Sequence, residues 1–322
     1  MTRKIFSVGV LVLMFSLFVF HLDPVFAQYP EKTIDFVVPF EPGGGTDLVA
    51  RTLERFVNPY LRGKIVIKNV AGAGGAIGFR EGAKAPADGY TLTMLVTSIM
   101  VGPNIMKGYP TYDLFDPICV VAQDPSAITV KTDSRFKTLE DLISYAKANP
   151  RMVSASTFGV GSISHLEMAA FEKATGTTFN LVPYKGAVPA LTAAIGGHVD
   201  VGPAGCSEAK TYVEGKKLRP LVVFGSKRSQ IYPDVPTAKE LGYDVVLYQW
   251  RGVGVPKGAP KEIKEVLSGA FKKAMENEEC KNTFEKLGLE RIYLGPEEAD
   301  RWLKVQNELI KNLATKIGLE PK

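Results

Sequence analysis

Residues 34–47, with the sequence IDFVVPFEPGGGTD, decide how the first half of the chain folds. The β-branched and aromatic residues 34–38, bounded by Pro39, predict a short buried strand. From Asp47 onward apolar residues recur at helical spacing, and Thr46 is expected to be the N-cap of that helix. A strand, a glycine loop and a helix N-terminus together expose several backbone N–H groups at one point, which suits an anion.

The three glycines of this stretch have two open interpretations. They form either a tight turn or a binding loop, and the stretch alone does not decide between them. A phosphate-binding P-loop is disfavoured, because Thr46 and Asp47 follow the glycines where a P-loop has a lysine and a hydroxyl residue. The acidic side chain disfavours a nucleotide phosphate and favours a smaller anion such as a carboxylate.

Residues 1–27 are predicted to be a signal peptide. Arg3 and Lys4 precede an apolar run, and residues 25–27 supply the small side chains that a signal peptidase reads. The apolar run is shorter than the ~20 residues of a membrane-spanning helix, and an uncleaved anchor is the alternative. We expect cleavage after Ala27. No cysteine lies near this point, so a lipid anchor is not expected. The remainder is long enough for two domains.

Charge and cysteine content disfavour several classes of protein. The net charge is +5, and the basic residues are scattered without the stripe that indicates nucleic-acid binding. The three cysteines, Cys119, Cys206 and Cys280, have no Cys-x-x-Cys or Cys/His spacing, so no metal site is expected. One disulfide with a free thiol and three unpaired buried cysteines both remain open.

A second glycine-rich loop, GAGGAIG at residues 72–78, follows a predicted strand at 65–67 and precedes a helical stretch to Ala85. It resembles a dinucleotide-binding fingerprint but fails the test, because Ile77 stands where the last glycine belongs. No acidic residue closes the next predicted strand, 92–96. No nucleotide cofactor is therefore expected, nor any other cofactor.

The middle of the chain repeats the unit of strand, glycine loop and helix. Strands at 119–122 and 127–130, interrupted by Asp124 and Pro125, predict a crossing between two lobes. Thr138 and Asp141 predict one capping box, and Ser164 and Glu167 predict a second, opening a helix at 166–174 that ends before Gly176. Further expected elements are strands at 153–156, 179–182, 199–201 and 221–224, a helix at 188–195, a loop at 202–205, a return crossing at 245–255, and helices at 260–275 and 296–313.

Two strand–loop–helix units in two α/β lobes direct two helix N-termini into one cleft, where such sheets usually bind ligands. This arrangement would hold an anion between the lobes. A bulkier residue at Gly44 or Gly161 is then expected to abolish binding.

A set of short motifs carries a resemblance to a known family: YP (29–30), VVPF (37–40), GGGTD (43–47), GAGG (72–75), PADGYTL (86–92), GVGS (159–162), HL (165–166), VPYKG (182–186) and DVPT (234–237). In this order they resemble a substrate-binding protein of the tripartite tricarboxylate transporter system, the Bug (TctC-like) family. The resemblance implies a periplasmic monomer with a type II binding-protein fold, and integral membrane transporter subunits as partners. It implies lobe 1 at 28–123 plus 251–322 and lobe 2 at 124–250.

The resemblance also implies that a small organic carboxylate is held by backbone N–H groups, hydroxyls and waters, without needing a buried arginine. The implied contacts from lobe 1 are Gly43, Gly44, Gly45, Thr46, Asp47, Ala73, Gly74 and Ser98. Those from lobe 2 are Ser156, Gly161, Ser162, Ser164, His165 and Gly205. For Asp47, direct contact and an ordering role in the loop both stay open.

Two departures from the family pattern bear on the ligand. Residues 98–106 and 203–206 are unusual for the family, the first being more apolar, and would give the ligand an apolar or aromatic far end if they line the cleft. Lys185 and Arg251 either meet a second carboxylate or form surface salt bridges.

Two other classes of function are considered. A sensor that presents its ligand to a membrane signalling protein would capture the ligand in the same way. An exported hydrolase using Ser162 and His165 is a remote alternative, because no G-x-S-x-G elbow is present.

Overall fold

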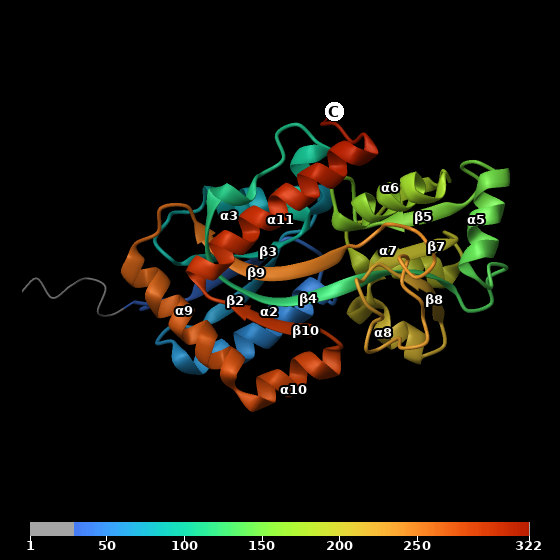
Figure 1. Ribbon diagram of the computed structural model, residues 1–322. Helices are drawn as coiled ribbons and strands as arrows, with labels where there is room; N and C mark the ends of the chain where they lie inside the picture. Colours follow the sequence, from blue (N-terminus) through green and yellow to red (C-terminus); the bar gives the residue numbers. More distant parts are fainter. Residues whose placement is uncertain (1–28, 322) are drawn as a thin grey trace, which may run out of the picture.

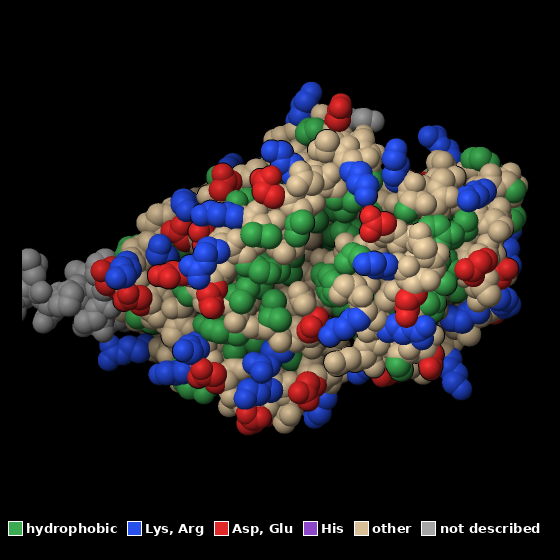
Figure 2. Space-filling model, in the orientation of Figure 1, with side chains coloured by type: hydrophobic (Ala, Val, Ile, Leu, Met, Phe, Trp, Pro, Cys, Tyr) green, Lys and Arg blue, Asp and Glu red, His purple; other side chains and the backbone are tan. Residues whose placement is uncertain are grey.

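The computed structural model describes residues 29–321, so the predicted signal peptide lies outside the described residues. It is an α/β fold in which ten strands form one sheet with the order β2-β1-β3-β9-β4-β7-β5-β6, while β8 and β10 also pair with β4. Figure 1 shows two lobes at the two ends of this sheet, joined by β4 and β9. On the face drawn in Figure 2, Lys and Arg side chains are spread over both lobes and interspersed with Asp and Glu, and they form no basic stripe there.

Lobe 1 is built on three parallel strands whose sequences were predicted as strands. They are β1 (Ile34–Val38), β2 (Ile65–Asn69) and β3 (Thr91–Val96). The apolar side chains of β1 and β3 are buried because helices cover the sheet, whereas β2 at its edge leaves Val66 exposed. The covering helices are α2 (Gly45–Val57), α3 (Ala76–Lys84) and α9 (Lys261–Glu276). The short α4 (Ser98–Val101) follows β3 directly.

The crossing between the lobes is made by β4 (Phe115–Lys131) and β9 (Tyr248–Pro256), which pair antiparallel. The predicted interruption at Asp124 and Pro125 is wrong, because both residues pair with β9 inside one continuous strand. Up to Pro125, β4 pairs with β9 and β10, and from Ser126 onward it pairs with β7 and β8. A proline is tolerated where strand pairing changes, since it cannot donate a ladder hydrogen bond.

Lobe 2 combines β5 (Ser154–Thr157), β6 (Asn180–Pro183), β7 (Val201–Gly205) and β8 (Leu218–Val223) with α5 (Leu139–Ala148), α6 (Ile163–Thr175), α7 (Ala187–Gly196) and α8 (Cys206–Glu214). The predicted loop at 202–205 is wrong. These residues are fully buried in β7, where Pro203 pairs with Ile128 of β4. The helix α8 was not predicted.

The helix starts differ from the predicted ones in two places. The N-cap of α2 is Gly44 and not Thr46. The predicted capping box of Ser164 and Glu167 is wrong, because α6 begins after Ser162 and both side chains bond elsewhere. The capping box of Thr138 and Asp141 is confirmed, with both bonds present.

The C-terminal segment covers the crossing strands. The helix α11 (Pro296–Ile317) contacts β4, α4 and α6, and therefore touches both lobes (Figure 1). Its Trp302 packs edge-on against Trp250 of β9, with ring centroids 5.6 Å apart. The preceding α10 (Glu278–Leu287) and β10 (Glu290–Leu294) were not predicted. None of the helices within residues 29–321 combines the length and apolarity needed to span a bilayer.

All three cysteines are buried and free, which decides between the two open alternatives. Burial raises the pKa of Cys280 to about 11 and the pKa values of Cys119 and Cys206 still further above the ordinary value. Because the thiolate is the reactive species, we expect a thiol reagent at pH 8 to leave the native chain unlabelled and to label all three cysteines in denaturant. Rapid labelling of the native chain, counted by mass spectrometry, would contradict this packing.

Candidate ligand-binding cleft

A cavity lies between the lobes, with β9 at its floor. It offers about 20 Å³ to the centre of a water molecule, which is room for roughly one water. Residues of lobe 1, lobe 2 and β9 line it: Phe40, Glu41, Gly44, Gly45, Thr46, Val96, Thr97, Ser98, Phe158, Ile163, Ala187, Glu208, Gln249, Trp250 and Arg251. Both lobes therefore contribute to a closed, partly apolar site.

The N-terminus of α2 opens onto this cavity. Its N-cap, Gly44, provides no side-chain hydrogen bond. A Cβ on Gly45 would lie 2.6 Å from Cγ of Glu208 and 2.8 Å from Nη2 of Arg251. The glycine thus allows two charged side chains to pack directly against the helix end, where the helix dipole carries partial positive charge.

The side chain of Asp47 orders the glycine loop from behind. It accepts hydrogen bonds from the Gly43 N–H at 2.9 Å, from Nε of Arg51 at 2.8 Å and from Nδ2 of Asn69 at 2.9 Å. Burial alone would raise the pKa of Asp47, but the bonds from Arg51, Gly43 and Asn69 bring it below the ordinary value. These contacts are those of an ordering residue.

At the N-terminus of α6 the polar side chains bond mainly within their own loop. The Ser162 hydroxyl donates to the Gly159 carbonyl at 2.6 Å, and the Ser164 hydroxyl accepts from the Phe158 N–H at 2.8 Å. Nδ1 of His165 accepts from the Gly161 N–H at 3.3 Å, and burial lowers the pKa of this histidine.

Two direct contacts close the cleft. The Ile163 N–H of lobe 2 donates to the Ser98 hydroxyl of lobe 1 at 3.1 Å. Gly74, with φ +64°, presses against lobe 2 so closely that a Cβ there would overlap the Val160 carbonyl oxygen and lie 3.0 Å from the Ser162 nitrogen. The Tyr109 hydroxyl holds this loop by donating to the Gly74 carbonyl at 2.7 Å.

The predicted site residues fall into three groups. Gly44, Gly45, Thr46 and Ser98 line the cavity. Gly74 and Gly161 lie where the two lobes meet, Ala73 begins the same short turn as Gly74, and Gly43 carries the bond to Asp47. The remaining ones bond within lobe 2: Ser156 to the Val201 carbonyl, Ser162, Ser164 and His165 in the α6 loop, and Gly205 to Glu208.

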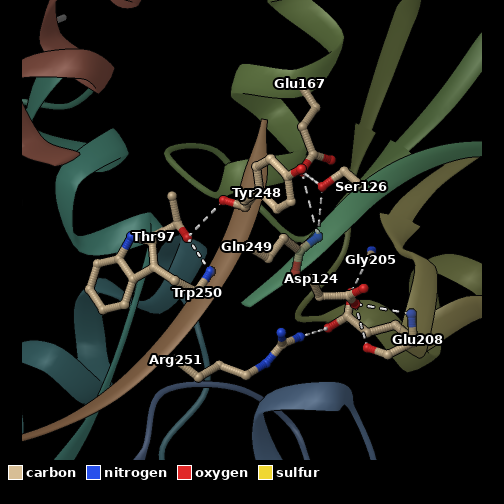
Figure 3. A network of polar contacts seen from close by, with 11 residues as sticks. Thr97, Asp124, Ser126, Glu167, Gly205, Glu208, Tyr248, Gln249, Trp250 and Arg251 are labelled. Atoms are coloured by element: carbon tan, nitrogen blue, oxygen red, sulfur yellow. Dashed lines mark hydrogen bonds and ion pairs between the residues drawn. The ribbon is translucent and has the colours of Figure 1, made fainter. Parts of the chain in front are cut away.

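A buried polar network forms the floor of the cavity (Figure 3). Arg251 of β9 is 1% exposed, and its Nη2 lies 3.4 Å from Oε1 of Glu208. Its Nε and Nη1 have no hydrogen-bond partner among residues 29–321. Oε2 of Glu208 accepts from the Gly205 N–H at 2.9 Å. Next to it, Asp124 accepts from the Ser207 N–H at 3.0 Å, and burial raises its pKa to about 7.

A third carboxyl, that of Glu167, is buried behind this floor. Glu167 contacts Ser126 and Gln249, and burial raises its pKa to about 8. The Thr97 hydroxyl accepts from the Trp250 N–H at 2.9 Å and so ties β3 to β9 (Figure 3). Glu208 and Glu167 were missed as parts of the site, since the first lies on an unpredicted helix and the second was assigned to a cap.

Comparison with known proteins agrees with this geometry. The family model for the tripartite tricarboxylate transporter family receptor matches residues 49–319. Protein BugT of Bordetella pertussis is 33% identical over 322 residues, which cover 96% of this chain and 98% of that protein. Among solved structures, the periplasmic binding protein BugD has a TM-score of 0.87 at 31% identity, covering 91% of this chain and 100% of that one.

A further solved structure, Rpa4515 of R. palustris with adipate, has a TM-score of 0.86 at 29% identity and covers 91% of this chain and 100% of that one. The predicted fold class is thereby confirmed. The match along nearly the whole chain shows that this protein belongs to the tripartite tricarboxylate transporter receptor family, the TctC or Bug family of periplasmic binding proteins.

Proposed function

We propose that this chain is an extracytoplasmic receptor that captures a small carboxylate between its lobes and delivers it to the membrane subunits of a tripartite tricarboxylate-type transporter. The observation that carries this proposal is the closed cleft in which the uncapped N-terminus of α2 meets the guanidinium of Arg251. The relative Rpa4515, solved with adipate, supports a carboxylate as ligand. Cleavage after Ala27 and a periplasmic monomer with lobe boundaries at 124 and 251 belong to the same proposal.

Ligand entry requires the lobes to move apart. A cavity with room for roughly one water is too small for a carboxylate of several carbons. Since β4 runs without interruption from lobe 1 into lobe 2 and β9 begins at the same crossing, a hinge motion about this crossing is the expected way to open the cleft.

The apolar part of the site has a different origin from the expected one. Of residues 98–106 only Ser98 lines the cavity, and of residues 203–206 none does. Apolar walls come instead from Phe40, Phe158 and Trp250. A ligand with a short apolar body between or beside its acidic groups fits such walls.

A hydrolase is disfavoured by the bonds of its candidate residues. The Ser162 hydroxyl donates to Gly159, and Nδ1 of His165 accepts from Gly161. Among the described residues these two side chains do not bond to each other, so the activated nucleophile of a serine hydrolase is not formed. A sensor role would use the same cleft, and co-purification with a signalling protein instead of a permease would favour it.

The test is a thermal-shift screen of residues 28–322 against mono-, di-, tri- and aromatic carboxylates, with amino acids and sugars for comparison. A ligand at ~100 times its dissociation constant should add roughly 2.7 kcal/mol of stability, a shift of a few degrees. A shift confined to carboxylates supports the proposal. Shifts with sugars alone would overturn it, and isothermal titration would then identify the true ligand class.

A further inference from the structure

We propose that Arg251 binds the acidic group of the ligand and that Glu208 is its built-in competitor, a carboxylate that the ligand must displace. This inference rests on the proposed function and adds a side-chain cation to a site expected from the resemblance to use backbone groups. It also gives a role to Glu208, which no sequence motif indicated.

Arg251 has the properties of a binding residue. A buried charge is costly unless its hydrogen bonds are made, yet within the described part of the chain Nε and Nη1 of this buried guanidinium have no partner. The side chain also lines the cavity. These free donors belong to a planar fork that matches a carboxylate. The uncapped N-terminus of the 13-residue helix α2 lies beside it, so two sources of positive potential converge.

The carboxylate of Glu208 itself already occupies the position beside Arg251. It extends from α8 of lobe 2, and its Oε1 lies 2.8 Å from where a Cβ of Gly45 would be. Its contact with Arg251 is a single one, at 3.4 Å, and leaves the other donors unused (Figure 3). A ligand carboxylate that binds Arg251 through two bonds would therefore gain more than it displaces, while repulsion by Glu208 limits its affinity.

Asp124 adds negative charge around the guanidinium when it is ionised, above its raised pKa of about 7. It interacts electrostatically with both Arg251 and Glu208, and both carboxyls flank Gly205. The guanidinium of Arg251 thus faces two carboxyl groups from its own chain. Removing one of these carboxylates should raise the affinity for an anionic ligand. Removing the acid of a purely structural ion pair should not raise that affinity, so the direction of the change tests the proposal.

The test compares four variants by isothermal titration with mono-, di- and tricarboxylates, adipate among them. Arg251→Met should weaken carboxylate binding on the order of 100-fold, and Glu208→Gln should strengthen it about tenfold. The double variant, which removes both members of the buried ion pair, should bind as weakly as Arg251→Met, so that loss of binding is separable from misfolding caused by an unpaired Glu208. Arg251→Lys keeps the charge without the fork and should be intermediate.

Arg228→Met and Glu240→Gln are the matched controls, because this surface pair has a 3.0 Å contact and both side chains are nearly half exposed. They should bind like the wild type. If Arg251→Met binds as tightly as wild type, or if Glu208→Gln weakens binding as Arg251→Met does, the inference is overturned while the receptor function stands. If no carboxylate binds the wild type or any variant, the proposed function itself has failed.

Discussion

Gly74→Ala should lower the affinity for a carboxylate by about 10- to 100-fold while unfolding remains cooperative. The added Cβ would overlap the Val160 carbonyl oxygen, and Gly74 and Val160 belong to different lobes. The methyl group therefore obstructs the closed cleft and not the packing of either lobe. Forcing atoms into a packed contact costs about 1–3 kcal/mol, which corresponds to this loss of affinity. Titration calorimetry gives the affinity, and urea unfolding gives the stability.

Gly108→Ala is the control for backbone strain alone. Its φ of +72° is close to the +64° of Gly74, but nothing lies within 4 Å of the position of its Cβ. It should lose about 1–2 kcal/mol of stability and keep its affinity. Wild-type affinity in Gly74→Ala would show that the ligand is bound without this loop contact. For Gly44 the structure revises the loss of binding expected from the sequence, at least for alanine, because a Cβ there would meet its nearest neighbours, among them Ala187, only at 3.8 Å. Gly44→Ala should therefore be tolerated.

Glu167→Gln should make the chain progressively more stable than the wild type as the pH rises from about 5 to 9. Burial raises the pKa of Glu167 from 4.5 in the unfolded chain to about 8, and its Oε2 has no hydrogen-bond partner among the residues that the structure describes. Between these two values the folded protein keeps a proton that the unfolded chain releases, so raising the pH destabilises the folded state. The stability that protonated Glu167 contributes to the wild type is fully present below pH 4.5 and lost above pH 8. The difference should reach a few kcal/mol, since one pH unit contributes up to about 1.4 kcal/mol.

Urea unfolding of both proteins at pH 5, 7 and 9 measures this difference. Subtracting the two curves removes the titration of other groups, and the charge of the nearby Asp124 adds to the raised pKa of Glu167. Glu140→Gln is the matched control, because Glu140 is exposed on α5. If the difference in free energy of unfolding between the wild type and Glu167→Gln is constant across this range, burial does not raise the pKa of Glu167.

Local patterns were enough to find the strands of lobe 1 and most helices. The runs at 34–38, 65–67 and 92–96 became β1, β2 and β3, because β-branched and apolar residues bounded by turn residues have few alternatives to a buried strand. The capping box at Thr138 depends only on residues three apart and was likewise found. These features are decided within a few residues of the chain.

Other features depended on what packs against the segment. Residues 202–205 contain glycine and proline, which predict a loop, but they form a buried strand because β4 supplies a partner. Glu167 has the spacing of a capping residue, yet it is buried against Ser126, 41 positions away in sequence.

The sequence by itself determined the two-lobe α/β class, the glycine loops and the residues of α2 that open onto the cleft. Only the tertiary structure decided the charged floor of the cleft, where Arg251 and Glu208 meet across 43 positions of sequence. Arg251 was recognised as a candidate, but its partner was not. A long-range ion pair forms when separate elements are packed together and water is excluded from both charges, and no local pattern of residues encodes that packing.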